Sequence, residues 1–420
     1  MAVTDVQHWS LACFQDYGDR GSVALIHCRD GQFTVQKMAQ TAASGLSHEK
    51  RPVYLSSTDS GEAIMMDAVS KKISLSLHVP EDAFGIYYYP DTEQNVMWCT
   101  IDGDKNNGAD PLNCSDGGAS VIAMRGEGNE TSLLKLICLG RGHHVVTAVN
   151  HPQLPKKVFV SSLLDGILSV IDNDPTSDNY LNIIETINLC QPNREKDSAT
   201  DVPNNAFPHG MAFSPLTRKI YCLNNGYANI NVVDPVTHEV EALIDMELSS
   251  NLLLSPCGRY LIGKGADRKS NPDHVIGRLC VLDAQTQKME TVLDLQDIYP
   301  SCYRFTPDGK KLYVTTAATG KGTQKDNLIY DTLYIYDSSA LPVLTLLKEV
   351  KVGQADCGRR SIAFLKHNKQ TPYVFVPNPS EGTVSILDGN TDDVLDTVSV
   401  GQTGAQETAF NYWDGRFYGA

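Results

Sequence analysis

Two histidine motifs have side chains suited to metal or haem ligation. The pair His143-His144 and the single His209 each stand immediately before an apolar run typical of a strand. Neutral imidazole binds Zn, Cu and Fe and serves as an axial ligand of haem. If the two runs are equivalent strands of neighbouring repeat units, His144 and His209 face one channel with His143 beside them. The alternative is structural: a strand-initial histidine bonds a backbone carbonyl, and His143 points outward because strand neighbours alternate.

Arg359 and Arg360 form the second candidate group. Guanidinium groups bind carboxylates and phosphates in bidentate geometry. We therefore expect both arginines to attract an acidic substrate or the propionates of a haem, and to take part in catalysis. The alternative is an ion pair with a carboxylate of the same ring, for which the candidates are Asp82, Asp356 and Glu407.

Two further groups offer oxygen ligands for a hard cation. Asp102, Asp104, Asn106 and Asp110 alternate as in a Ca²⁺ loop, although the usual glycine and glutamate are missing, so the alternative is a plain polar loop. A metal-assisted hydrolase of the lactonase kind would need a hard cation held by carboxylate and amide oxygens. The residues that suit this role are Asp82, Asn251 and Glu407.

The elements that must position these residues recur along the chain. A small residue, alternating apolar positions and a final Asp occur at 61–67, 166–172, 228–234, 277–283, 331–337 and 382–388. Two copies without the Asp lie at 21–27 and 118–124. Successive copies end 40 to 62 residues apart, which is the spacing of propeller blades and not of solenoid repeats. We expect the repeated Asp residues to cap the turn that follows each strand.

Each copy is the third strand, c, of a four-stranded unit with strands a to d. The sequence therefore predicts an all-β fold, a β-propeller of eight four-stranded blades forming one domain over residues 1–420, with seven blades as the alternative. The segment 407–418 supplies an a and a b strand, and 22–38 supplies a c and a d strand. We expect these halves to pair and to close the ring, which leaves no free sheet edge.

The long connections would gather at one rim of this ring. Three b-to-c connections are long (101–118, 265–276 and 317–330), and so is the d-to-a connection 189–208. Alignment of the units places Ser250, Ser301, Arg360 and Gln406 at positions equivalent to His144 and His209. The sequence thus predicts a lidded channel mouth, with neutral loop insertion as the alternative.

The strand pattern, with Leu312-Tyr313-Val314-Thr315-Thr316 as its most typical piece, resembles the propeller repeat named after Tyr-Val-Thr-Asn. The resemblance covers nearly the whole chain. The superfamily includes the eight-bladed haem d1 domain of cytochrome cd1 nitrite reductase and its haem d1 assembly relatives, and the eight copies favour that branch. No Cys-x-x-Cys-His site is present, so the c-type cytochrome half is missing. Seven-bladed copper and quinone-enzyme subunits are more distant.

Composition restricts the partners. The formal net charge of −15 argues against nucleic acid and against an anionic membrane surface. No apolar segment reaches the length of a signal or a span. The 11 cysteines contain no Cys-x-x-Cys pair, so we expect reduced thiols and a cytoplasmic protein.

Three functions remain open. The first is a metal- or haem-dependent protein (Cu, Fe or Zn) with redox chemistry on a small molecule at the channel mouth. The second is a non-catalytic scaffold that binds a protein partner. The third is the metal-assisted hydrolase. The histidines favour the first, in which the chain is an enzyme of oxidoreductase type.

Overall fold

A computed structural model describes most of the chain. The described residues are 8–15, 22–38, 52–57, 62–67, 73–78, 86–91, 93–94, 96–101, 120–127, 130–142, 145–195, 201–356, 360–367, 370–401, 408–409 and 417–419. Within them the chain is almost entirely β.

The strands of the first half of the chain are β1 (His8–Gln15), β2 (Ser22–Arg29), β3 (Gln32–Met38), β4 (Pro52–Ser57), β5 (Glu62–Asp67), β6 (Ile73–His78), β7 (Ile86–Asp91), β8 (Val96–Ile101), β9 (Ser120–Glu127), β10 (Glu130–Cys138), β11 (Val146–Ala148), β12 (Lys157–Ser162), β13 (Ile167–Asp172), β14 (Ile183–Asn188), β15 (Pro208–Ser214) and β16 (Lys219–Asn224). Those of the second half are β17 (Asn229–Val233), β18 (Val240–Asp245), β19 (Asn251–Leu254), β20 (Tyr260–Asp267), β21 (Ile276–Asp283), β22 (Lys288–Gln296), β23 (Pro300–Phe305), β24 (Lys311–Thr316), β25 (Thr332–Asp337), β26 (Thr345–Lys351), β27 (Ala363–His367), β28 (Gln370–Asn378), β29 (Thr383–Asp388), β30 (Val394–Ser399), β31 (Thr408–Ala409) and β32 (Phe417–Gly419). Two short helices, η2 (Pro192–Arg194) and α2 (Gln324–Asn327), lie in connections.

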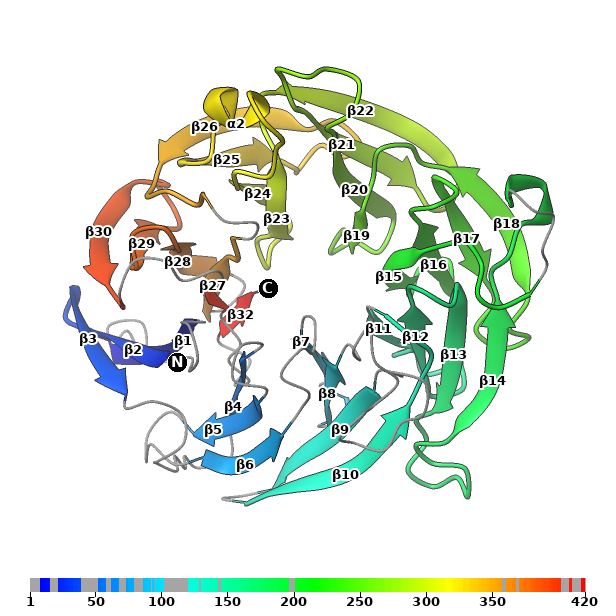
Figure 1. The fold of residues 1–420 in the computed structure, drawn as a ribbon. Coiled ribbons are helices and arrows are strands. Elements are labelled where there is room, and N and C mark those ends of the chain that lie inside the picture. Colours follow the sequence, from blue (N-terminus) through cyan, green and yellow to red (C-terminus); the bar gives the residue numbers. More distant parts are fainter. Residues whose placement is uncertain are drawn as a thin grey trace.

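The strands form antiparallel sheets set around a common axis, which is the arrangement of a β-propeller (Figure 1). Four sheets of four consecutive strands, β11–β14, β15–β18, β19–β22 and β23–β26, follow one another along the chain. Their first strands lie innermost and their last strands outermost (Figure 1). The remaining described strands make a β7–β10 sheet, a β4–β6 sheet and two sheets that contain the ends of the chain.

The hydrophobic core lies between neighbouring sheets. Tyr221 and Leu223 of β16 pack against Leu252 and Leu261 of the next sheet. The same kind of contact recurs between the β19–β22 and β23–β26 sheets and between the β23–β26 sheet and the sheet of β27 to β30. The outermost strands are different, because in β22 half-buried and exposed side chains alternate. This period of two is what one buried face and one solvated face require.

The ends of the chain pair differently from the prediction. Strand 22–28 was expected to pair directly with the C-terminal strands, but β1 lies between β2 and β31, with Phe14 opposite Ala409. The other C-terminal strand, β32, pairs with β27 of the adjacent sheet. The segment 8–15 has the period-two pattern of a strand. Its pairing with β2 closes only a short loop, at lower entropic cost than a contact between the two ends of the chain.

The repeated Asp residues cap turns, as predicted. The Oδ1 atom of Asp234 accepts hydrogen bonds from the backbone N–H groups of Val236 (2.7 Å) and Thr237 (2.9 Å). The same bond to the residue two positions on is made by Asp172, Asp283, Asp337 and Asp388. The side chain of Asp67 lies outside the described residues.

One cysteine departs from the expectation of reduced thiols. Cys138, the last residue of β10, is disulfide-bonded, whereas six others in the described part of the chain are free thiols: Cys28, Cys190, Cys222, Cys257, Cys280 and Cys302. Among the described residues, no helix is both long and apolar enough to cross a bilayer.

Candidate functional site

Two inner strands begin with a proline and a bulge. In β15 the pairing with β16 shifts register between Pro208 and Met211, and in β23 the pairing with β24 shifts between Pro300 and Tyr303. A bulge turns side chains out of the regular alternation of a strand. We call the end of the propeller where these inner strands begin the mouth.

At the mouth, His209 contacts the neighbouring sheet. Its Nδ1 atom lies 2.6 Å from the carbonyl oxygen of Ser250, which precedes β19. Gly210 makes this approach feasible: it has φ +126°, and a Cβ atom there would stand 2.9 Å from the Cα atom of Asn251. The Pro-His-Gly sequence is therefore explained by a close crossing of two inner strands.

The contacts continue into the next sheet. The backbone N–H of Ser250 donates to the carbonyl oxygen of Lys264 in β20 (2.6 Å). The ammonium of Lys264 in turn donates to the carbonyl oxygen of Pro300 in β23 (3.4 Å). The β15–β18, β19–β22 and β23–β26 sheets are thus connected at the mouth by polar groups.

Arg360 extends this series by one more sheet. Its backbone N–H donates to Oγ of Ser301 (2.8 Å), and Thr315 Oγ1 donates to its carbonyl oxygen (2.8 Å). The side chain is only 1% exposed, and Nη2 donates to the carbonyl oxygens of Tyr330 and Gly353. The guanidinium therefore lies inside the contact between sheets, where it anchors backbone.

His209 thus contacts Ser250, and Arg360 contacts Ser301, and each pair joins the starts of two neighbouring inner strands. Several other candidates lie outside the described residues: His143, His144, Arg359, Gln406, Asp82, Glu407 and the loop residues Asp102, Asp104, Asn106 and Asp110. Asn251 is described, and its Oδ1 accepts the N–H of Leu252 (2.8 Å). Within the described part of the chain, no three His, Cys, Asp or Glu side chains are grouped to hold a metal ion.

Two of the long connections meet over the mouth. Gln324, buried in the β24–β25 connection, donates from Nε2 to the carbonyl oxygen of Asn271 in the β20–β21 connection (2.6 Å). Thr323 Oγ1 donates to Asp273 Oδ1 (2.8 Å), and Asn327 Nδ2 donates to the carbonyl oxygen of Asp273 (3.0 Å). The two loops therefore form one interlocked cover over the β19–β22 and β23–β26 sheets.

The connection that begins after β14 also folds back on the protein. Asn205 donates from its backbone N–H to Glu195 Oε1 (2.8 Å), and Tyr227 donates its hydroxyl proton to the same oxygen. These contacts fasten both described parts of the connection to the β15–β18 sheet.

Sequence reasoning missed Lys264. Burial lowers the pKa of Lys264 to about 8; the charge of Arg304 acts in the same direction, and Cys302 opposes it. The available signal was a lysine inside the apolar run Tyr260-Leu261-Ile262-Gly263-Lys264. The corresponding position is occupied by Ser161 in β12 and by Thr315 in β24.

Comparison with known proteins supports the fold. No protein-family model matches the chain, and no curated protein matches it. Among solved structures, a protein from Lactobacillus plantarum superposes with a TM-score of 0.56 at 14% identity, covering 97% of this chain and 100% of its own. The periplasmic gluconolactonase PpgL of Pseudomonas aeruginosa gives a TM-score of 0.56 at 12% identity, covering 86% and 99%.

A third similar structure belongs to the cytochrome d1-like group. The dihydro-haem d1 dehydrogenase NirN, solved in complex with DHE, gives a TM-score of 0.54 at 12% identity and covers 86% of this chain and 66% of its own. These neighbours are β-propellers, and at such identities the likeness establishes the fold alone.

Proposed function

We propose that this chain is a single eight-bladed propeller that binds a transition-metal ion (Cu, Fe or Zn) or a haem-like cofactor at the mouth, and uses it in redox chemistry on a small molecule. The ring would be completed by the sheet that contains β1 to β3 and β31. The observation that carries the proposal is the orientation of His209 by the Ser250 carbonyl at 2.6 Å.

That contact defines the proton position on the imidazole. A carbonyl oxygen only accepts hydrogen bonds, so Nδ1 carries a proton, and in the neutral imidazole the lone pair is on Nε2. Histidine ligands of metals are commonly oriented in this way, with the second nitrogen donating to a backbone carbonyl. The donor type therefore fits a borderline metal ion or the iron of a haem, which would supply the redox chemistry.

The other candidates would complete the site. We place His144 beside His209 as a second ligand, with His143 as its neighbour, because the repeat alignment makes the two blades adjacent at the mouth. Arg359 would neutralise an acidic group of the ligand, while Arg360 would hold the adjacent backbone in place. The fold of the dihydro-haem d1 dehydrogenase is compatible with a haem-like ligand, since it is a propeller of the same kind.

The test is the metal content and the visible absorbance of untagged protein, alone and after addition of Cu, Zn, Fe or haem. We expect one ligand per chain in the wild type and its loss in His209→Ala. His151→Ala is the matched control, because this histidine lies in the β11–β12 turn, where its Nδ1 atom accepts the backbone N–H of Gln153 (3.2 Å). Binding should weaken as pH falls through about 6.5, because ligation needs an unprotonated nitrogen. A wild type that binds none of these ligands contradicts the proposal.

The second candidate function is the hydrolase. It is favoured by the position of Asn251, whose backbone lies against Gly210 at the close crossing of two inner strands. It would hold a hard cation through Asp82, Asn251 and Glu407, and the fold of the periplasmic gluconolactonase is compatible with it. Binding of Ca²⁺ or Mn²⁺ that is lost in Asn251→Leu but retained in His209→Ala would select this function over the first.

One observation favours the alternative of a non-catalytic scaffold. Large apolar side chains are exposed on consecutive outer strands, among them Leu243 of β18 (54%), Leu347 of β26 (51%) and Leu395 of β30 (48%). A second copy of this chain is the occupant to test, since isologous apolar surfaces pair readily. Sedimentation of wild type and Leu347→Glu would detect it, and a monomeric wild type would exclude this self-association.

A further inference from the structure

Lys264 lies in the contact between two sheets at the mouth. It is 8% exposed, and it shares a face of β20 with Tyr260 and Ile262, which pack into the core shared with β23 and β24. Its backbone is opposite Asn251 of β19. The ammonium is therefore at the level where the inner strands begin.

The surroundings of this ammonium are poor in acceptors. Of its three N–H donors, one reaches the Pro300 carbonyl at 3.4 Å, and the charge stands 5.7 Å from the ring centre of Tyr303. Within the described part of the chain it forms no ion pair, and the titratable groups that act on it are Cys302 and Arg304 of β23. A buried cation without a counter-charge is costly, so the arrangement suits an amine that is completed by a ligand.

The fold does not require a lysine at this position. The corresponding Thr315 makes the equivalent link to the next sheet, donating to the carbonyl oxygen of Arg360 (2.8 Å). A short hydroxyl is thus sufficient for the contact between sheets. The longer, charged side chain of Lys264 needs another explanation.

The interlocked loops carry Arg268, Lys269, Lys321 and Lys325, but also Asp267, Asp273 and Asp326. These charges largely offset one another, so the positive charge that would hold an anion is that of Lys264 itself.

We propose that Lys264 is the anchor of an oxyanion site, which binds the carboxylate or phosphate group of a small molecule entering from the mouth between the β19–β22 and β23–β26 sheets. This site lies at the same mouth as the proposed metal or haem site, but it needs neither His209 nor a metal ion.

Binding should be accompanied by proton uptake. An anion beside the amine favours its charged form, so the pKa of Lys264 rises from about 8 towards its ordinary value when the site fills. At about pH 7 the free amine is already mostly protonated, whereas at about pH 9 it is mostly neutral. Uptake is therefore small at the lower pH and approaches one proton at the higher.

The experiment is titration calorimetry of the full chain with succinate and with inorganic phosphate, in EDTA, in two buffers of different ionisation enthalpy. We expect at least one probe to bind, and roughly tenfold or greater weakening in Lys264→Met. The matched control Lys269→Met removes an exposed lysine of the adjacent loop and should weaken binding far less. Succinate without phosphate identifies a carboxylate site, and the reverse a phosphate site.

Two further measurements separate this inference from the metal proposal and from a folding defect. His209→Ala should bind the anion like the wild type, and Lys264→Met should retain metal or haem binding. Lys264→Met should also melt at the same temperature or higher, because an apolar side chain of similar length removes the cost of the buried charge. No binding of either probe, equal binding by Lys264→Met, or proton uptake that does not depend on Lys264 would each overturn the proposal.

Discussion

At the scale of single residues, His238 is the most informative titratable group away from the mouth. It lies in the β17–β18 turn with φ +63°, and its Nε2 atom is 2.5 Å from the ammonium of Lys157 in the preceding sheet. An ammonium only donates, so Nε2 accepts and the imidazole is neutral. Burial first, and then the charge of Lys157, lower the pKa of His238, against the opposing charges of Glu185 and Asp234.

This lowered pKa predicts a pH dependence of stability. The unfolded chain, with the ordinary histidine pKa of about 6.5, takes up the proton before the folded protein does. The contribution of neutral His238 is therefore present above about pH 6.5 and is lost as pH falls towards the lower folded pKa. His238→Asn tolerates the positive φ and cannot titrate, so its unfolding free energy should fall less steeply below that pH. Urea unfolding between about pH 5 and pH 8 measures the slopes, and equal slopes would contradict the prediction.

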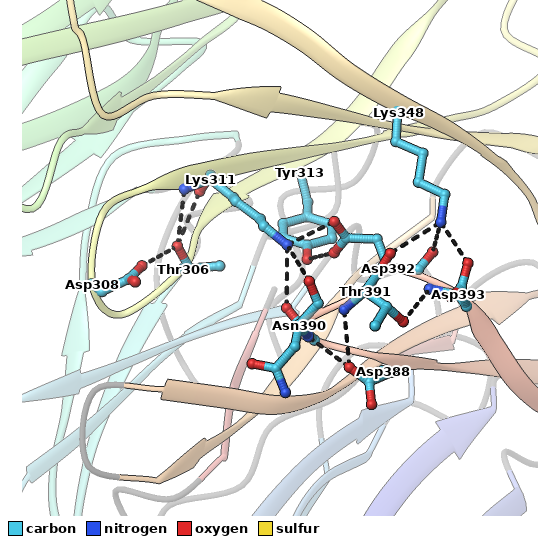
Figure 2. Close-up of polar contacts among 11 residues, drawn as sticks. Thr306, Asp308, Lys311, Tyr313, Lys348, Asp388, Asn390, Thr391, Asp392 and Asp393 are labelled. Atoms are coloured by element: carbon cyan, nitrogen blue, oxygen red, sulfur yellow. Dashed lines mark hydrogen bonds and ion pairs between the residues drawn. The ribbon is translucent and has the colours of Figure 1, made fainter.

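At the scale of elements, the β29–β30 turn is fastened to the preceding sheet by a group of polar contacts (Figure 2). Asp392, with φ +61°, accepts from Lys311 Nζ (2.6 Å) and from the hydroxyl of Tyr313. Lys348 donates to Asp393 Oδ1 (2.6 Å) and to the carbonyl oxygen of Asp392 (3.1 Å). The turn is thus fixed from both the second and the outermost strand of its neighbour.

The two carboxylates of this turn should differ in their contribution to stability. Asp392→Asn keeps the shape and the tolerance of positive φ but removes the charge from a buried contact, so it should cost about 2 kcal/mol. Asp393→Asn is the matched control, because its carboxylate is 67% exposed and water screens such exposed pairs, so that this change should cost much less. Chemical denaturation compares the two, and equal losses would mean that the buried contact adds nothing.

At the scale of the whole molecule, the two C-terminal strands belong to different sheets. Strand β31 pairs with β1, and β32 pairs with β27. Removal of residues 402–420 takes away β31 and β32 and leaves β1 and β27 with unpaired edges. We expect a lower melting temperature and aggregation, since free edges recruit other chains. Removal of residues 413–420 alone deletes only β32 and should have a smaller effect. A long truncation that melts like the full chain would show that β31 is dispensable.

Features that depend only on nearby residues could be predicted from the sequence. The Asp caps depend on groups two or three residues apart, as between Asp234 and Val236, and the strand pattern depends on alternation within a few residues. The equivalence of His209, Ser250, Ser301 and Arg360 followed from the same repeat, because each stands at the start of an inner strand. These features need no knowledge of which sheets are neighbours, so the sequence alone determined them.

The tertiary structure decided the features that depend on which residues of a neighbouring sheet a side chain contacts. The guanidinium of Arg360 turned inward onto backbone carbonyls, and Lys264 became a buried amine, because the β23–β26 sheet covers both. Strand β2 paired with β1 and not with the C-terminal segment, since the short loop makes the local pairing cheaper in entropy. Burial, and with it the pKa of a lysine, is set by residues distant in the chain that only packing brings together.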